Sequence, residues 1–396
     1  MDMCPEKERY QREHFNQYKS FEMRRNETGA LVLDHRLMIK EYSRSSADQD
    51  LPLPNELRSS EALLETLKYI LKEIASQAQH KSEAENGWIA DWFDFIWNRT
   101  RSIRKDITQQ RLNDQKSVQI HEICARFHIY CSHKFCDQPA EVFSFKINND
   151  HLVNCLQSLT EFYDDPTTDS SPNEAEFRAY VILSKLDDGS ILTKTQRLKP
   201  QIRNSPQVKI ALKLCFAYNS RNYVKFFRII LAHNFSYIAA CLIHRYIVKM
   251  RLEAVKSISV SYFRRQYQFE KICEILCFDS EEDAIFFFDQ LSIEIENLDG
   301  EKYTKFPPNL RNFNDKILAR RSFRLVESKF EGSSQHLCDI IYGAKIRDSN
   351  TNYPLHQQSF NSMGYYVAND LPDFEPQQQP QSVLNRRPSP LPFIEK

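Results

Sequence analysis

Residues 291–306 read LSIEIENLDGEKYTKF. Apolar and polar residues alternate across 291–296, a period of two that predicts a β-strand with one buried face. Asp299-Gly300 follows, a dipeptide typical of tight hairpin turns, and residues 303–306 are suited to the return strand. The segments before this stretch predict helices, so we expect one small β-hairpin in a helical protein.

Two helices are predicted just before the hairpin, at 261–278 and 280–291. Ser280 is a typical N-cap residue, and the acidic residues after it suit the positive end of the helix dipole. Helices followed by a two-stranded wing are typical of a winged helix. We therefore expect a winged helix over residues 258–332.

Residues 59–257 carry apolar side chains at the spacing of amphipathic helices. The predicted helices lie at 59–74, 88–107, 118–135, 151–163, 174–184, 207–217, 223–232, 236–250 and 252–257. Their joints are short, and each helix is too small to bury its apolar face alone. This pattern predicts an all-α helical-repeat array, although no strict sequence repeat supports it.

The two ends of the chain differ from the array. The first 45 residues are highly charged, with Phe15, Tyr18 and Phe21 spaced three apart, which predicts a surface helix with a narrow apolar stripe. Beyond Gly332 the sequence turns to Gln, Pro, Asn and Ser, which predicts disorder. The predicted segments are thus 1–58, 59–257, 258–332 and 333–396.

Composition argues against several functional classes. Only 7 glycines occur in 396 residues, whereas phosphate loops and Rossmann crossovers need glycine. The sequence has no H-E-x-x-H or G-x-S-x-G motif, so we expect no enzyme and no cofactor. Lys plus Arg equals Asp plus Glu, at 53 each, so nucleic acid contact requires a local patch.

Cysteine usage and hydropathy indicate the compartment. The 10 cysteines lack paired extracellular spacing, which indicates a reducing compartment, cytosol or nucleus. The longest strongly apolar stretch, 237–243, is far shorter than the roughly 20 residues of a membrane span. We expect no membrane contact.

A group of soft ligands suggests a zinc site: Cys124, His128, Cys131, His133 and Cys136. On a helix, the first three share one stripe, whereas His133 and Cys136 point elsewhere. Free cysteine is among the most buried residue types. A buried core stripe is therefore the preferred interpretation, and a metal site is the alternative.

A basic segment overlaps the hairpin and follows it. Its cations are Lys302, Lys305, Arg311, Lys316, Arg320, Arg321 and Arg324, against the single acid Asp315. Aromatic residues interleave with them at Tyr303, Phe306, Phe313 and Phe323. Cations neutralise phosphates and aromatic rings stack on bases, so the segment predicts RNA or DNA contact. In the alternative interpretation the rings are core and the cations balance the acids at 279–283.

A second basic group lies on the helix predicted at 88–107 and just beyond it. Arg99, Arg101, Arg104 and Lys105, with Arg111 nearby, could pair with phosphates or with an acidic partner surface. The alternative is a solvated or intramolecular helix face, since surface charge runs often mean no more than that. We assign the first four residues to partner binding.

Several sequence blocks, in a constant order, resemble those of one family. They are Met3-Cys4-Pro5 with Glu8, Arg9, Arg12, Glu13 and Phe21-Glu22; Lys40, Tyr42, Arg44, Ser45 and Ala47; Leu57-Arg58 with Leu64, Thr66 and Tyr69; Arg99, Arg101, Ile103, Arg104, Asp106, Thr108 and Gln110; Glu122, Arg126 and His128; and Leu276 to Ala284. The chain resembles the GANP (germinal-centre-associated nuclear protein), or Sac-three domain, family over roughly residues 3–332. Asn98 and Ser220-Arg221-Asn222 depart from its usual pattern. Without a nucleoporin-like segment or a centrin-binding helix, the chain looks most like the short stand-alone members.

The resemblance implies a TPR-like or PCI-like helical stack capped by a winged helix, which docks beside that of a PCI-domain partner. A small acidic DSS/Sem-type subunit would bind that partner, and the paired winged helices would offer a basic face to RNA. We expect a scaffold of a nuclear mRNA-export (TREX-two-like) complex, located in nucleus and cytoplasm. The alternative, implied by the short members, is a centrosome or spindle scaffold with centrosomal partners, acting in centrosome duplication and mitotic progression.

Overall fold

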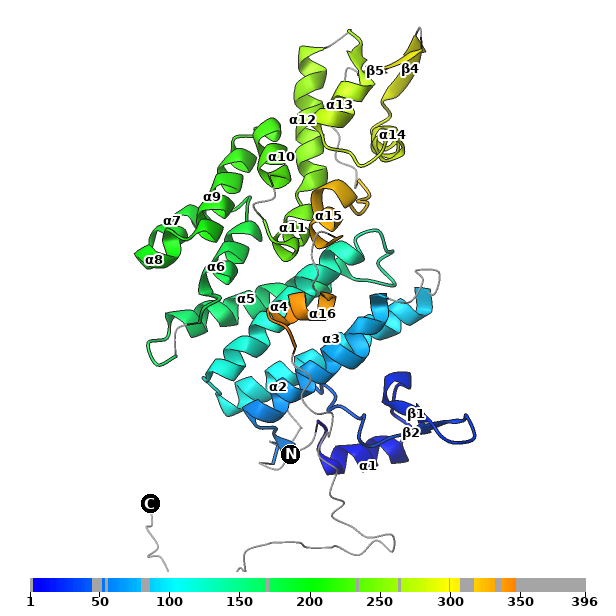
Figure 1. The fold of residues 1–396 in the computed structure, drawn as a ribbon, viewed down its shortest axis with the longest axis vertical. Helices are drawn as coiled ribbons and strands as arrows, with labels where there is room; N and C mark the ends of the chain where they lie inside the picture. The colour runs from blue at the N-terminus through cyan, green and yellow to red at the C-terminus, as the bar shows by residue number, and fades with distance from the viewer. Residues whose placement is uncertain are drawn as a thin grey trace, which may run out of the picture. The chain divides into compact units, whose positions relative to one another are not determined.

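The structure, a computed structural model, describes residues 3–44, 52–53, 56–79, 86–168, 171–232, 235–262, 265–298, 300–306, 317–331 and 336–346. All of them belong to one compact unit. They are mostly helical, with two small antiparallel sheets (Figure 1). The predicted all-α class with a small hairpin is confirmed. Among these residues, no helix combines the length and the hydrophobicity that a bilayer span requires.

The central helices follow the periodic segments of the sequence. They are α2 (Ser60–Tyr69), α3 (Asn86–Gln110), α4 (Gln115–Lys134), α5 (Phe145–Asp164), α6 (Glu174–Leu183), α9 (Pro206–Asn219) and α10 (Tyr223–Leu231). The short elements η3 (Ile70–Ile74) and η4 (Ala75–Gln79) continue α2. The helices α7 (Ser190–Gln196) and α8 (Pro200–Arg203) lie where periodicity predicts none.

Polar side chains define where many of these helices begin. Each of the following accepts a hydrogen bond from the backbone N–H three residues later: Ser59, Asp114, Ser144, Ser205, Asn222, Ser236 and Ser280. A cap of this kind is worth about 1 kcal/mol. Short helices with short joints are therefore specified locally, before any packing.

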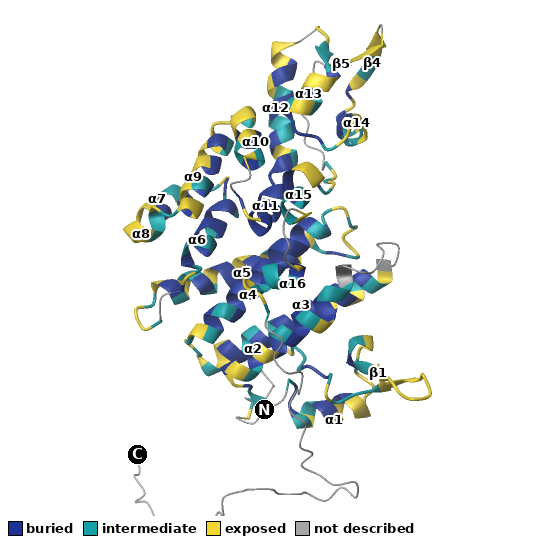
Figure 2. Cartoon of the chain, in the orientation of Figure 1, coloured by how far each residue is buried: buried dark blue, intermediate teal, exposed yellow. Residues whose placement is uncertain are grey.

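Neighbouring helices pack on one another largely in chain order. α5 contacts α4 and α6, α6 contacts α9, and α9 contacts α10. α11 (Tyr237–His244) packs back on α4 and α6. Buried residues run along α4 and α11 in Figure 2. α4 contacts α2, α3, α5, α11 and α16 (Leu337–Tyr342), which explains why it is buried on nearly every face.

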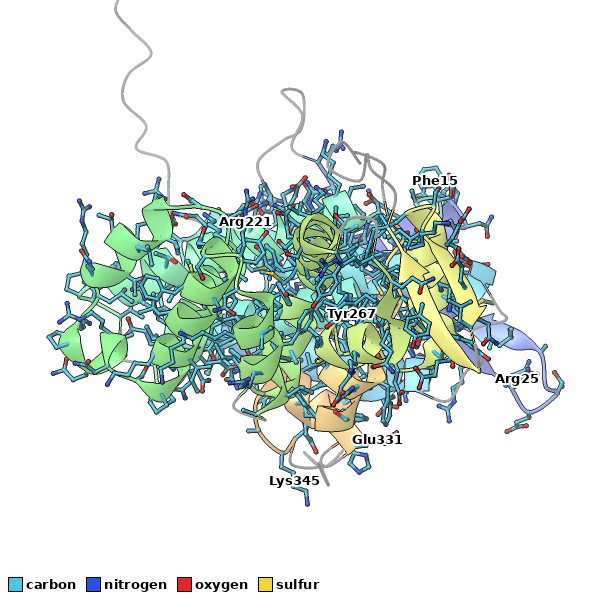
Figure 3. All side chains as sticks on the ribbon, turned by 90° about the horizontal axis from the view of Figure 1, so that it is seen from above. Phe15, Arg25, Arg221, Tyr267, Glu331 and Lys345 are labelled. Carbon is cyan, nitrogen blue, oxygen red and sulfur yellow. The ribbon has the colours of Figure 1, made fainter. Side chains whose placement is uncertain are left out.

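The predicted hairpin lies near the end of the described chain. The elements here are α12 (Ile247–Ser261), β3 (Tyr267–Gln268), α13 (Phe269–Ile275), α14 (Glu281–Gln290), β4 (Glu294–Leu298) and β5 (Glu301–Lys305). β4 and β5 pair with Ile295 opposite Thr304, and β3 adds a third strand beside β5 (Figure 3, with Tyr267 labelled). The hairpin is confirmed. The winged-helix assignment of 258–332 stays a prediction, and its start falls inside α12.

The first 45 residues contain the predicted surface helix, but the predicted apolar stripe is wrong. The observed elements are α1 (Glu6–His14), η1 (Ser20–Glu22), β1 (Met23–Arg25) and β2 (Leu31–Leu33). α1 stops before Phe15, which is 65% exposed, and Asn16 takes a left-handed φ of 53°. The buried residues of α1 are Arg9 and Arg12. The aromatic spacing misled because the side chains of α1 that face the protein are charged.

Two helix predictions near residue 250 also need correction. The helix expected at 236–250 breaks at Arg245 and Tyr246, and α12 then runs on to Ser261. The helix expected at 261–278 is wrong in its first half, because Tyr267 and Gln268 pair with β5. Sheet pairing thus outweighs local helical periodicity.

The turn between α9 and α10 contains the departure Ser220-Arg221-Asn222. Arg221 takes a φ of 53° there, and Figure 3 labels it. Left-handed backbone is the conformation for which glycine is preferred. The departure therefore raises the conformational free energy of the backbone at Arg221 alone. The helices α9 and α10 on either side of the turn are still formed.

Part of the segment predicted to be disordered is folded. After η6 (Phe323–Glu327) and α15 (Ser328–Glu331), α16 packs on α4 with Leu337 and Ile341 buried. Cys338 Sγ lies 3.1 Å from the carbonyl oxygen of Leu71. The predicted disorder is wrong for residues 336–346 because two apolar residues one turn apart find a place in the core. Residues beyond 346 lie outside the described part.

Candidate nucleic-acid and partner interface

The basic segment around the hairpin is largely paired with carboxylates. Lys302 pairs with Glu281, Lys305 pairs with Glu296 at 3.2 Å, and Arg320 pairs with Asp283 at 3.0 Å. Arg321 lies 3.6 Å from Asp137. Exposed pairs of this kind are worth about 0–1 kcal/mol, so phosphates could replace the carboxylates. The cations nevertheless have intramolecular partners, as the alternative interpretation expects.

The remaining members of this segment differ in exposure. Arg324 is exposed, and its backbone N–H donates to Asp279 at 2.8 Å. Arg311, Lys316 and Phe313 lie outside the described residues. Phe306 is buried in the core, whereas Phe323 is 51% exposed. Nucleic-acid contact by Lys302, Lys305, Arg311, Lys316, Arg320, Arg321 and Arg324 stays a prediction.

Arg99 lies inside the protein. Its guanidinium contacts Glu22 at 3.2 Å and Glu41 at 3.3 Å, and its side chain is 1% exposed. It stacks 4.6 Å from the centroid of Phe95. The charge of Arg99 is therefore used in intramolecular ion pairs, and its side chain is too buried to contact a partner protein.

Glu22 is the centre of a buried network that the sequence analysis missed. It accepts hydrogen bonds from Arg12, from Arg99 and from the backbone N–H of Ile39 at 3.2 Å. A buried carboxylate requires such partners, because an unpaired charge in the interior is very unfavourable. The high charge density of the first 45 residues could have indicated this network. Its charged side chains at Arg12 and Glu22 form buried ion pairs and are not exposed to solvent.

A second buried network joins the N-terminal block to α3. Asp106 pairs with Arg58 at 2.8 Å and with Lys40 at 2.7 Å. Arg58 also donates to the carbonyl oxygen of Met3 at 3.1 Å and to Ser102 at 3.0 Å. These contacts hold residues from four of the family-like blocks together and stabilise the fold.

Arg101, Arg104 and Lys105 are half-buried on the same helix. Arg101 lies 3.9 Å from the ring centroid of Tyr42. Lys105 Nζ donates to the carbonyl oxygen of Ser43 at 2.8 Å, and Arg104 Nη2 lies 3.2 Å from Nδ1 of His151. Partner binding by these three residues stays a prediction.

Asn98, the other departure from the family-like pattern, lies beside this group. Its side-chain oxygen accepts from the backbone N–H of Tyr42 at 2.9 Å and from Arg99 at 2.7 Å. The amide thus ties the segment of Tyr42 to α3 and pairs with Arg99 without carrying a charge. The local geometry is retained despite the departure.

The Cys124, His128 and Cys131 stripe is buried in the core, as preferred from the sequence. Burial lowers the pKa of His128 to about 3, and its Nδ1 donates to Asn148 at 2.8 Å. His133 is also buried, but it lies against His244, 4.6 Å between ring centroids. Within the described part of the chain, no three His, Cys, Asp or Glu side chains converge as metal ligands would.

A pocket of about 310 Å³ lies between α6, α9, α11 and α16. Its polar wall is the pair of Arg126 and Glu176, joined by two hydrogen bonds of 2.9 and 2.8 Å. Tyr180 donates to the same carboxylate at 2.7 Å. The polar groups of this wall thus bond to one another.

The comparison with known families identifies the family of this chain. The sequence model described as the SAC3/GANP family matches residues 3–297. The chain belongs to the SAC3/GANP family. The match includes the buried networks of Glu22 and Asp106 and continues into β4. The resemblance inferred from the sequence blocks is therefore confirmed.

Several SAC3/GANP relatives share extended similarity with the chain. It is 32% identical over 416 residues to protein xmas of Drosophila melanogaster, covering 100% of the chain and 19% of that protein. It is 32% identical over 375 residues to SAC3 family protein 1 of Schizosaccharomyces pombe, covering 87% of the chain and 34% of that protein. It is 29% identical over 275 residues to SAC3 family protein B of Arabidopsis thaliana, covering 65% of the chain and 15% of that protein. The chain thus spans between 15% and 34% of the length of these relatives.

Proposed function

We propose that the chain is a non-catalytic scaffold of a nuclear mRNA-export (TREX-two-like) complex. Membership of the SAC3/GANP family supports this role, as do the intramolecular ion pairs that hold the polar clusters described above. In this proposal the chain docks a PCI-domain partner, and a small acidic DSS/Sem-type subunit joins through that partner. The complex would work in the nucleus and cytoplasm.

One observation carries the proposal. From α12 onward the elements run helix, strand, helix, helix, strand, strand, and the sheet order is β3-β5-β4. This is the arrangement expected of a winged helix, and it follows a stack of capped helices. Such an end module supports docking beside the winged helix of a partner.

The docking surface we propose is the groove between α14 and β4. Ile285, Ile293 and Ile295 line it, with Asp289 and Lys302 at its edges. Ile285 and Ile295 are half-buried, so the groove offers apolar area without unfolding. An apolar centre with a polar rim is typical of a protein interface.

Affinity purification with mass spectrometry tests this docking. The tagged chain should recover a PCI-domain protein and a small acidic subunit, and Ile285→Glu should abolish that recovery because it places a charge in the apolar centre. Val153→Glu, at a 38% exposed position on α5, is the matched control. Recovery of the same partners by Ile285→Glu would contradict the docking surface. Recovery of centrosomal proteins alone would favour the centrosome or spindle scaffold.

RNA contact in this proposal uses the segment from Lys302 to Arg324. Charge reversal at Arg320, Arg321 and Arg324 should weaken RNA binding and flatten its dependence on salt, because fewer counterions are released. Fluorescence anisotropy with a labelled RNA measures both quantities. Unchanged binding would remove RNA contact by this segment from the proposal.

A further inference from the structure

Three cations of α3 and two aromatic rings form one surface, which we call the α3 surface: Tyr42, Trp97, Arg101, Arg104 and Lys105. The guanidinium carbon of Arg101 lies 3.9 Å from the ring centroid of Tyr42 and 5.7 Å from that of Trp97. Lys105 Nζ lies 5.6 Å from the centroid of Tyr42. All five side chains are half-buried. Arg101 and Lys105 are therefore interleaved with the rings, whereas Arg104 lies beside His151, with Nη2 3.2 Å from its Nδ1.

No carboxylate of the described residues lies within ion-pair distance of Arg101, Arg104 or Lys105. The nearby acids are committed elsewhere, since Asp106 binds Lys40 and Arg58. Glu41 likewise binds Arg12 and Arg99. The α3 surface thus differs from most of the hairpin segment, where Lys302, Lys305, Arg320 and Arg321 each have a carboxylate partner. Arg324 is the exception among the described cations of that segment, because it is its backbone N–H that bonds to Asp279.

Helical spacing puts the three cations on the same side of α3. Positions 101, 104 and 105 are related as i, i+3 and i+4, which brings the side chains onto one face. Their positive field affects the neighbouring groups. The pKa of His151 is lowered to about 4 by burial, by Arg104 and by Arg101. The pKa of Lys105 is lowered by burial and by Lys40, a cation outside the α3 surface, and Asp106 acts in the opposite direction.

Single-stranded nucleic acid matches this combination better than an acidic peptide does. Phosphates would compensate these cations, which have no carboxylate partner among the described residues, as carboxylates also would. Half-exposed rings add a second feature, because unstacked bases stack on aromatic side chains and on guanidinium planes. An acidic peptide makes no comparable use of Tyr42 and Trp97.

We propose that the α3 surface binds single-stranded nucleic acid. Arg101, Arg104 and Lys105 contact the phosphates, and the rings of Tyr42 and Trp97 lie against bases. This site is separate from the segment of Lys302 to Arg324. It holds whether or not the chain acts in mRNA export, because it rests on the charges and rings of α3 and its neighbour.

Fluorescence anisotropy on the full chain tests the site. The probes are fluorescein-labelled oligouridylate and oligothymidylate, each about 15 nucleotides long. Three phosphate contacts on a single strand contribute a slope of about −2 to the logarithm of affinity against the logarithm of salt. Raising salt from about 50 to about 200 mM therefore weakens binding about twentyfold through these contacts. The triple variant R101Q/R104Q/K105Q should lose this component.

A matched triple variant, K302Q/K305Q/R320Q, removes three cations from the hairpin segment. It should keep the component of the salt slope that R101Q/R104Q/K105Q loses. If the α3 triple variant keeps the wild-type slope, the proposal is overturned. It is also overturned if poly-glutamate displaces the oligonucleotides as well as unlabelled oligouridylate does, since the surface would then recognise acidic protein. Tighter binding of oligouridylate than of oligothymidylate identifies RNA as the ligand, and equal binding identifies any single strand.

Conservative variants separate binding from folding. R101K/R104K/K105R keeps the three charges, so it should retain the salt slope even where affinity falls. Tyr42→Phe keeps the ring and should bind as the wild type does, whereas Tyr42→Leu should weaken binding by about tenfold because one base loses its stacking partner. Equal binding by the Phe and Leu variants, with unchanged melting temperatures, would contradict the stacking role.

Discussion

The guanidinium of Arg126 covers the α-carbon of Gly343. A Cβ built on Gly343 would lie 2.5 Å from Nη1 of Arg126, and the backbone there has a φ of 86°. Arg126 is held by Glu176 and lies 4.8 Å from the ring centroid of Phe177. A residue of α4 and a residue just after α16 therefore depend on each other, although 216 positions separate Arg126 from neighbouring Tyr342.

Gly343→Ala should destabilise the protein by about 2–3 kcal/mol. Alanine would carry the cost of left-handed backbone and would also push Arg126 away from Glu176. Gly29→Ala is the matched control, because Gly29 has a φ of 80° with nothing within 4 Å of its Cβ position. The control should lose only about 1 kcal/mol. Urea unfolding measures both, and equal losses would show that Arg126 moves aside without cost.

Glu22→Gln should destabilise the protein by about 3–5 kcal/mol. The substitution leaves the buried guanidinium groups of Arg12 and Arg99 without their shared charge, and Glu22 itself has no exposed surface. The control is Glu13→Gln, whose carboxylate is 51% exposed and pairs with His35 at 3.0 Å. It should cost less than about 1 kcal/mol. Similar midpoints of denaturant unfolding for the two variants would refute this network as a major source of stability.

Stability should fall as the pH drops from about 6.5 towards 4. Burial lowers the pKa of His244 from 6.5 to about 4, with Nε2 donating to the carbonyl oxygen of Arg320 at 3.0 Å. Between those pH values the unfolded chain binds a proton at this position and the folded chain does not. Each such histidine therefore lowers the free energy of unfolding by about 1.4 kcal/mol for every unit by which the pH falls in this window. His121 and His151, whose pKa values are also lowered to about 4, act in the same direction.

His244→Gln isolates one of these protons. The amide can still donate to the carbonyl oxygen of Arg320, but it does not titrate. Between pH 6.5 and 4 the variant should therefore lose less stability than the wild type. The difference is the contribution of the one proton that His244 binds in the unfolded chain. Urea midpoints at several pH values give the slope. A variant as sensitive to acid as the wild type would exclude His244 as a contributor.

Helix and hairpin positions were predictable because their signals are local. Ser59 and Ser280 cap helices through hydrogen bonds that span three residues, and Gly300 supplies the backbone conformation of the hairpin turn. Periodicity failed where a partner from another part of the chain decides the structure. β3 exists because β5 lies beside it, and α16 is ordered because α4 offers it a place.

The candidate surfaces were harder to predict, because charge on a sequence does not reveal its partners. Arg99 and Arg101 stand two positions apart and look equivalent, yet Arg99 is enclosed with Glu22 while Arg101 faces Tyr42 at the surface. Helical spacing places them on different faces, but only the position of the N-terminal block shows which face is covered. The same limit applies to Lys302 and Arg320, whose carboxylate partners lie on α14.

The amino-acid sequence by itself determined the family, the helical class, most helix starts and the hairpin, because caps, turns and periodicity act within a few residues. The tertiary structure alone decided which charges are buried, which are paired with carboxylates, and which cations of α3 have no carboxylate partner among the described residues. Ion pairs and burial depend on groups tens to hundreds of residues apart, and their positions are set only when the helices pack.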